Sequence, residues 1–527
     1  MQQHIKQRFL EIISKPIFFP LMAFLTPLVI RFIPELIMGP YVVGFDTLAY
    51  YIPNTLVWLK GVTFWNFMAI APFFYVLLMG STSIGVPIVA SLKVMAPLLL
   101  GFLGLSVFFY ANKTLSWSPK KSLLVVFFAT LYFVALRISW DMLRSELGLI
   151  FLFATLIFLK KDGNSLRNGV LLSLAMLSVV FAHQLVAVIM FAIVLATIVR
   201  LYLGKEIVRL GRLIVCSAPA ACLFFLIVYA NYLSSSSFSV IRGFPGQDAG
   251  GFLALFGFAS YVDMVTDTLG FLVFCFLPIS PLVVLGARKF KSNLHLKVWI
   301  SWIFLSLLLD IASPNAFFAV YPYRWTLLLT YPLAFYAAAG FSSLKLNTHK
   351  AGACLILATF SLGFIALPNN FAFPYYLSYS NYMPISMLQN TVALSDAQDT
   401  VNALQWIKNN MPSNAHLLVH DAFYGWALLN LNDTQLMPYG YNNPETVAEK
   451  LRENDSLAPL YLIWWINGSG WHGQPTMSSA FVQVYESNKI AIFTYNFSYL
   501  STPNSESTKI LNLPFEYLKS NHGCIHG

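Results

Sequence analysis

Residues 38–51 read MGPYVVGFDTLAYY and follow the first long apolar segment of the chain, residues 16–34. Asp46 is the one charged residue of this stretch. No basic residue lies within ten positions before it, and the nearest one after it is Lys60. A charge in or beside the hydrocarbon of a membrane is costly and tends to face a cavity or a functional site. The stretch therefore indicates a functional loop at a membrane surface.

The composition of the whole chain supports a membrane location. Of the 527 residues, 57% are hydrophobic and only 10% are charged, whereas soluble domains carry about 25% charged residues. No short apolar segment with a small-residue cleavage site opens the chain, so we expect no removable signal peptide. No pair of the five cysteines has metal-ligand or redox spacing, and disulfides and structural zinc are not expected.

Charge is distributed unevenly along the chain. Residues 1–367 hold 26 Lys and Arg against 11 Asp and Glu, and residues 368–527 hold 6 against 11. A basic, apolar first part and an acidic, polar second part predict a transmembrane domain, 1–367, followed by an aqueous domain, 368–527. The positive-inside rule explains the basic excess, so no nucleic-acid partner is expected.

Apolar segments of about 20 residues predict membrane-spanning helices. The sequence predicts eleven, at roughly 16–34, 87–110, 122–137, 147–160, 167–182, 184–200, 213–231, 269–286, 297–311, 326–342 and 351–367. With the N-terminus in the cytoplasm, the inner segments carry 19 Lys and Arg and the outer loops only 6. This asymmetry predicts a multi-pass protein of the cell membrane whose residues 368–527 are extracellular. Residues 64–80 are expected to lie flat at the outer surface.

The predicted external part has an α/β pattern. Residues 397–412 and 443–455 have helical periodicity, while 415–420, 460–466 and 489–495 are short apolar runs typical of strands. The predicted fold class is therefore an α-helical polytopic membrane protein with a C-terminal extracytoplasmic α/β domain.

Two further outer turns carry clustered charge. Residues 137–148, RISWDMLRSELG, combine Arg137, Asp141, Arg144 and Glu146, and a helical turn would pair Asp141 with Arg144, or Arg144 with Glu146. Arg324 follows in VYPYRWTLLL, either as an interfacial residue that reaches toward water or as a fork for phosphate. His183, at an outer turn, is either a satisfied polar residue or a ligand.

Carboxylates and guanidinium groups on one membrane face suit a particular reaction, the transfer of a group from a lipid-anchored phosphate. The lipid tail needs a membrane groove, and the phosphate leaving group needs a cation. The acceptor hydroxyl needs a base, or a metal ion held by carboxylates.

At this point the sequence resembles a known superfamily, the GT-C membrane glycosyltransferases, which include oligosaccharyltransferases, protein mannosyltransferases and aminoarabinose transferases of lipid A. GFDTLAYY, 44–51, is similar to the Gly-x-Asp-x-x-x-Tyr loop of the oligosaccharyltransferases. RISWDMLRSELGLIFLF, 137–153, and PYRWTLLLTYPLAFYAAAGF, 322–341, look like stretches common in uncharacterised archaeal members. The order of elements matches along the whole chain.

The resemblance implies roles for these residues. Asp46 would be the catalytic base or a metal ligand, with Asp141 and Glu146 in the place of the second acidic motif and Mg or Mn as the ion. Arg324, with Arg144, His183 and Tyr50, would bind the substrate. The partners implied are a polyprenyl-phosphate-linked sugar donor, a lipid, glycan or protein acceptor, and membrane lipids.

The chain also departs from the superfamily. The second charged loop has no Asp-x-Asp or Glu-x-Asp. In place of the oligosaccharyltransferase acceptor motif Trp-Trp-Asp-Tyr-Gly it has VHDAFYGW, 419–426, and a WWING occurs only later, at 464–468. A transporter or lipid-linked-saccharide flippase is the main alternative, but it would show repeats and charges near the midplane, and only Lys93 looks deep. A non-catalytic scaffold would leave the clustered acids without a purpose.

Overall fold

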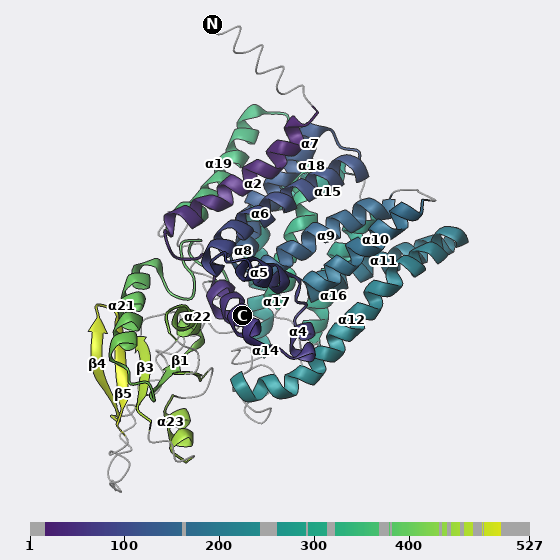
Figure 1. Cartoon of the computed structure of the whole chain (residues 1–527). Coiled ribbons are helices and arrows are strands. Elements are labelled where there is room, and N and C mark those ends of the chain that lie inside the picture. Colours follow the sequence, from purple (N-terminus) through teal and green to yellow (C-terminus); the bar gives the residue numbers. More distant parts are fainter. Residues whose placement is uncertain are drawn as a thin grey trace.

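The structure of the protein is a computed structural model. It describes residues 16–160, 165–242, 261–290, 293–312, 322–367, 379, 382–431, 435–439, 444–453, 458–466, 477 and 479–496. A large helical body lies beside a small unit that contains the sheet (Figure 1). The two meet near α8 (Phe133–Asp141), α22 (Asp421–Asn430) and the first loop, the stretch of residues 38–51.

Helices dominate residues 16–367, because long apolar runs satisfy their backbone hydrogen bonds internally. In chain order they are α2 (Phe18–Ile37), η1 (Thr47–Tyr51), α3 (Ile52–Lys60), α4 (Phe64–Ala69), α5 (Phe73–Ser83), α6 (Ile88–Phe109), η2 (Tyr110–Thr114), α7 (Pro119–Leu131), α8 (Phe133–Asp141), α9 (Leu143–Lys160), α10 (Leu166–Ala182), α11 (Gln184–Leu203), α12 (Ile207–Arg242), α14 (Tyr261–Phe276), η3 (Leu277–Ile279), α15 (Ser280–Lys289), α16 (Leu294–Ala312), α17 (Pro322–Leu328), α18 (Thr330–Ser343) and α19 (Asn347–Ala366).

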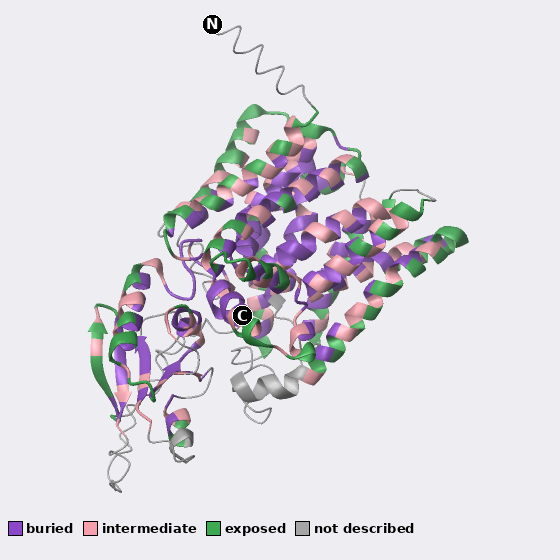
Figure 2. Ribbon diagram, in the orientation of Figure 1, coloured by how far each residue is buried: buried purple, intermediate pink, exposed green. Residues whose placement is uncertain are grey.

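Each predicted span coincides with a helix or a broken helix, but the count of eleven is not confirmed. Within the described residues, seven helices are long and apolar enough to cross a membrane, or eight if the pair α7 and α8, bent by 58°, is one span. The others are short or carry more charge. The segment predicted to lie flat forms two short helices, α4 and α5. Buried residues run through the middle of the bundle, and much of α12 and α19 faces outward, as expected for lipid-facing helices (Figure 2).

The sheet has five strands in the order β2-β1-β3-β5-β4. β1 (His416–Val419) is parallel to β2 (Leu436–Pro438) and β3 (Leu460–Trp465), and β5 (Ile490–Tyr495) is antiparallel to β3 and to β4 (Phe481–Ser487). The helices of this unit are α21 (Leu394–Asn410), α22 (Asp421–Asn430) and α23 (Pro444–Glu453). The predicted α/β pattern is therefore confirmed. The elements β2, β4 and α22 were not predicted.

The two parts share a core where they meet. One hydrophobic cluster joins Val42, Leu48 and Ile52 of the first loop region to the interior of the sheet unit. The contact is tight, because a Cβ on Gly425 of α22 would lie 2.0 Å from the carbonyl oxygen of Leu48. The first loop is therefore fixed between the helical body and the sheet unit. The boundary at residues 367 and 368 stays a prediction.

Candidate functional site

Asp46 lies in the turn that precedes η1, and its position depends on Gly44. Gly44 has a φ of +99°, and a Cβ there would lie 2.0 Å from the carbonyl oxygen of Trp140. Only glycine accepts this backbone conformation at this separation. The glycine therefore lets the first loop rest against α8, one residue from Asp141.

Asp141 ends α8 and forms an ion pair with Arg137, one helical turn earlier. The predicted pairing with Arg144 is wrong, because the helix breaks at Met142 and Arg144 belongs to α9. Spacing of four residues, 137 to 141, was the better signal in the sequence. Tyr51 of η1 donates a hydrogen bond of 2.8 Å to the backbone oxygen of Asp141. Both acid-bearing segments are thus held together.

The charges of three distant segments act on Asp46. They are Asp141 and Arg137 of α8, Arg144 of α9 and Arg324 of α17. Burial and the neighbouring carboxylate of Asp141 raise the pKa of Asp46 to about 7, against the opposing charges of the three arginines. No described residue forms an ion pair with the half-buried Asp46. A carboxyl group with a pKa near neutrality suits a general base.

Arg324 belongs to the same cluster of charges. Arg324, on α17, is half-buried and places its Nε 3.3 Å from the hydroxyl oxygen of Tyr323. Asp46 and Asp141 both act on its charge. Tyr50 lies half-buried on η1, four residues after Asp46. The convergence of the first loop, α8 and α17 was predicted from the sequence, and the structure places these elements together.

Arg144 and His183 lie at the edge of this cluster. Arg144 Nη2 is 3.4 Å from the carbonyl oxygen of Ala71, and its guanidinium lies 5.6 Å from the ring centroid of Tyr75. His183 separates α10 from α11, is 9% exposed and has Nε2 3.1 Å from Ser145 Oγ. The charges of Arg144 and Arg324 act on His183. The charge of Arg144 also acts on Asp46.

Glu146 lies elsewhere. It is fully buried, and the charge that acts on it most is that of Arg31 on α2. Within the described residues, no three Asp, Glu, His or Cys side chains are close enough to hold a metal ion. Asp46, Asp141 and Glu146 therefore do not assemble the three-ligand set that the resemblance implied. The residues present do not fit a metal site of that kind.

A second group of charges, the α2 network, is formed by Arg31, Glu35 and Lys93. Arg31 Nη1 lies 2.8 Å and Lys93 Nζ 3.3 Å from the carboxylate of Glu35, which is 2% exposed. Arg31 also donates from Nε to Ser139 Oγ at 3.0 Å, which ties α2 to α8. Lys93, the one basic residue that the sequence placed deep in the membrane, is half-buried and pairs with Glu35.

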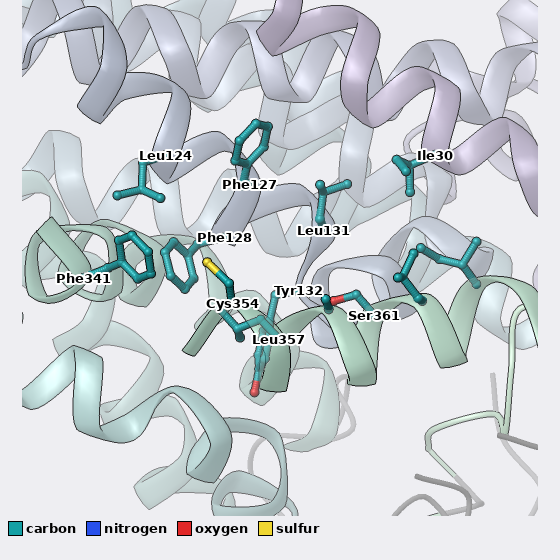
Figure 3. A pocket seen from close by; sticks show the side chains of 13 residues that line it. Ile30, Leu124, Phe127, Phe128, Leu131, Tyr132, Phe341, Cys354, Leu357 and Ser361 are labelled. Carbon is teal, nitrogen blue, oxygen red and sulfur yellow. The ribbon is translucent and has the colours of Figure 1, made fainter. Parts of the chain in front are cut away.

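A cavity of about 300 Å³ opens between α2, α7, α18 and α19 (Figure 3). Its lining is almost entirely apolar: Ile30, Leu124, Phe127, Phe128, Leu131, Tyr132, Phe341, Cys354, Leu357, Ala358, Ser361, Leu362 and Ile365. Tyr132 directly precedes α8, whose other end is Asp141. At 1.5 Å per residue the helix separates cavity and acid by about 12 Å. The cavity is suited to an apolar chain.

Comparison with known proteins identifies the fold. No protein-family model matches the chain, and no curated protein matches its sequence. Among solved structures, ArnT from Cupriavidus metallidurans in the apo state has a TM-score of 0.52 and 14% identity, over 92% of this chain and 98% of that one. The same protein bound to undecaprenyl phosphate has a TM-score of 0.51 and 13% identity, over 90% and 97%.

The oligosaccharyltransferase of Archaeoglobus fulgidus in the apo form matches less closely, with a TM-score of 0.47 and 12% identity over 85% of this chain and 70% of that one. A likeness at that score carries no argument. The match to ArnT over nearly the full length of both chains confirms the predicted GT-C fold. The protein is a multi-pass membrane protein with this fold.

Proposed function

We propose that the protein is a membrane glycosyltransferase that moves a sugar from a polyprenyl-phosphate or polyprenyl-diphosphate donor to an acceptor hydroxyl. The observation that carries the proposal is the convergence of Asp46, which no described residue pairs, with Arg324 and Arg144. A solved structure of the same fold holds undecaprenyl phosphate, which supports a lipid phosphate as the donor's carrier.

Each part of the site has a task in this reaction. The acceptor oxygen attacks the anomeric carbon of the sugar while Asp46 takes the proton of the hydroxyl. The bond between that carbon and the phosphate oxygen breaks, and the electron pair leaves with the phosphate. Arg324 meets the charge that develops there, because a guanidinium fork matches phosphate oxygens. The apolar cavity receives part of the lipid tail.

Transfer of labelled sugar is the test of this function. Purified protein in lipid nanodiscs is supplied with radiolabelled polyprenyl-phosphate sugars and with membrane extract as the acceptor source. We expect the labelled sugar to move from the lipid fraction to an acceptor. The proposal is supported if wild-type protein transfers the sugar and Asp46→Asn protein does not. Equal transfer of sugar by both proteins contradicts the proposal. EDTA separates the roles of Asp46: loss of activity restored by Mg²⁺ or Mn²⁺ supports a metal ligand in place of a direct base.

We also propose that the sheet unit and the site face the outside of the cell. The predicted asymmetry of basic residues supports this orientation. The exposed Lys408 on α21 and Lys120 on α7 allow a test in a chain without native cysteines. An impermeant thiol reagent added to intact cells should label Lys408→Cys and not Lys120→Cys. The reverse pattern contradicts the orientation.

A further inference from the structure

The crossing segment, residues 382–393, leads into the sheet unit and contacts both segments that carry the acids of the site. The backbone oxygen of Gln389 accepts two hydrogen bonds, one of 3.1 Å from the N–H of Gly44 and one of 3.0 Å from Nε1 of Trp140. Gly44 lies two residues before Asp46, and Trp140 lies one residue before Asp141. A single carbonyl group thus joins the two acid-bearing segments.

Asn390, the next residue, holds the same loop through its side chain. It is fully buried, and its Nδ2 donates a hydrogen bond of 3.0 Å to the backbone oxygen of Val42. Its Oδ1 accepts a bond of 3.0 Å from the N–H of Val392, which fixes the side-chain orientation. Both ends of the amide are therefore engaged, and the donor end points to the first loop.

The loop is held from the opposite side as well. Lys93 of α6 donates a hydrogen bond of 2.8 Å to the backbone oxygen of Tyr41. The helical body therefore binds the carbonyl group of Tyr41, and Asn390 binds that of the next residue, Val42. After Asp46, the chain is fixed again where Gly425 of α22 packs on Leu48. Trp426 of the same helix donates a bond of 3.2 Å to Thr391 Oγ1. Asp46 therefore lies between two clamped points.

We propose that Asn390 is a positioning residue for Asp46, because its amide and the adjacent Gln389 carbonyl hold the loop of Asp46 against α8. The inference rests on the proposed function of Asp46. The crossing segment also contacts the cluster, because Arg137 Nε donates a hydrogen bond of 2.6 Å to the backbone oxygen of Tyr382. Through Gln389 it joins the loop of Asp46 to the end of α8 that carries Asp141. Loss of this hold lowers turnover more than donor binding, since the arginines remain on α8, α9 and α17.

Two variants and a matched control test the inference. Asn390→Ala removes both bonds. Asn390→Asp keeps the size and the acceptor for Val392 but loses the donor to Val42, and it replaces the alanine variant if that fails to fold. Asn430→Ala is the control, because Asn430 also donates from Nδ2 to a backbone oxygen, that of Trp426 at 2.8 Å, but within α22.

Both Asn390 variants should lower kcat by about 10²-fold, the loss expected when a reacting group is displaced by about 1 Å. The KM for the lipid-linked donor should change by less than about threefold, as expected when ground-state binding is retained. The control should behave as wild type. The inference is overturned if the Asn390 variants have the same kcat as the control. It is also overturned if they raise KM and leave kcat unchanged.

Hydrogen exchange provides a readout that does not depend on activity. In wild type the N–H of Gly44 is bonded to Gln389, so peptides covering residues 41–46 should exchange slowly. They should exchange faster in both Asn390 variants and not in the control. Unchanged exchange overturns the inference even if sugar transfer is found. If wild type transfers no sugar, the proposed function fails, and faster exchange still supports the hold on the loop.

Discussion

Two groups of charges meet at α8, one through Ser139 and the other through Asp141, and they differ in whether their acids form ion pairs. In the α2 network, each carboxylate oxygen of Glu35 has a cation beside it: Arg31 Nη1 at 2.8 Å and Lys93 Nζ at 3.3 Å. In the candidate site, Asp46 has no ion-pair partner among the described residues, although three arginines act on it. Removing one partner of a buried pair is strongly destabilising. The comparison favours a structural role for the paired charges, and it supports the proposal that Asp46 acts on a bound molecule.

Asp46→Asn is the sharpest way to break this comparison. The amide keeps the shape of the side chain and cannot take a proton, so turnover should fall by about 10²–10⁴-fold, the usual contribution of a general base. Because Asp46 pairs with no described residue, thermal stability and donor binding should stay nearly as in wild type. The measurements are kcat, donor affinity and the unfolding temperature. A large loss of thermal stability would show that Asp46 has a structural role, like the paired charges of the α2 network.

Glu35→Ala tests the other side of the comparison. It leaves the buried Arg31 and the half-buried Lys93 without their carboxylate, and we expect the free energy of unfolding to fall by about 3–5 kcal/mol. The control is Glu206→Ala, which removes a pair with Arg209 whose side chains are 43% and 46% exposed. An exposed pair contributes about 0–1 kcal/mol. Chemical denaturation in detergent measures both, and equal effects would show that the α2 network has no special structural role.

Arg324→Ala should weaken donor use more than folding. The lost charge-assisted contact to phosphate is worth about 1.5–3 kcal/mol, or roughly ten- to 150-fold in donor affinity. Lysine should rescue only in part, because it lacks the planar fork. Donor binding is measured by titration with the labelled lipid phosphate. Unchanged affinity would favour the alternative that Arg324 only extends toward the membrane interface.

The sequence predicted the parts of the molecule that depend on local pattern. Long apolar runs marked the helices, and short ones marked β1, β3 and β5, because burial on both faces leaves a continuous apolar signature. The strand β4 was missed because most of its side chains are exposed or half-buried. Exposure removed the apolar run that marks a buried strand.

The site was predictable in its elements and not in its pairings. Gly44, Asp46 and Arg324 carried enough signal in their residue types. Because the helix breaks at Met142, Arg144 belongs to the next helix, and Asp141 forms its ion pair with Arg137 instead. The charge that acts most on Glu146 is that of Arg31, 115 residues earlier, and no local spacing in the sequence reports such a distant neighbour. Gln389 acts through a backbone carbonyl, which any residue type supplies, so its bonds to Gly44 and Trp140 left no trace in the sequence.

The pH dependence of turnover tests the central claim most directly. Burial and Asp141 raise the pKa of Asp46 to about 7, so below this pH the carboxyl group is protonated and cannot act as a base. In wild type, kcat should rise about tenfold per pH unit up to neutrality and then level off, as for one ionisation with that pKa. Asp46→Asn should give a low and flat profile over the same range. A wild-type profile without this rise, or the same rise in the variant, would contradict the assignment of Asp46 as the base.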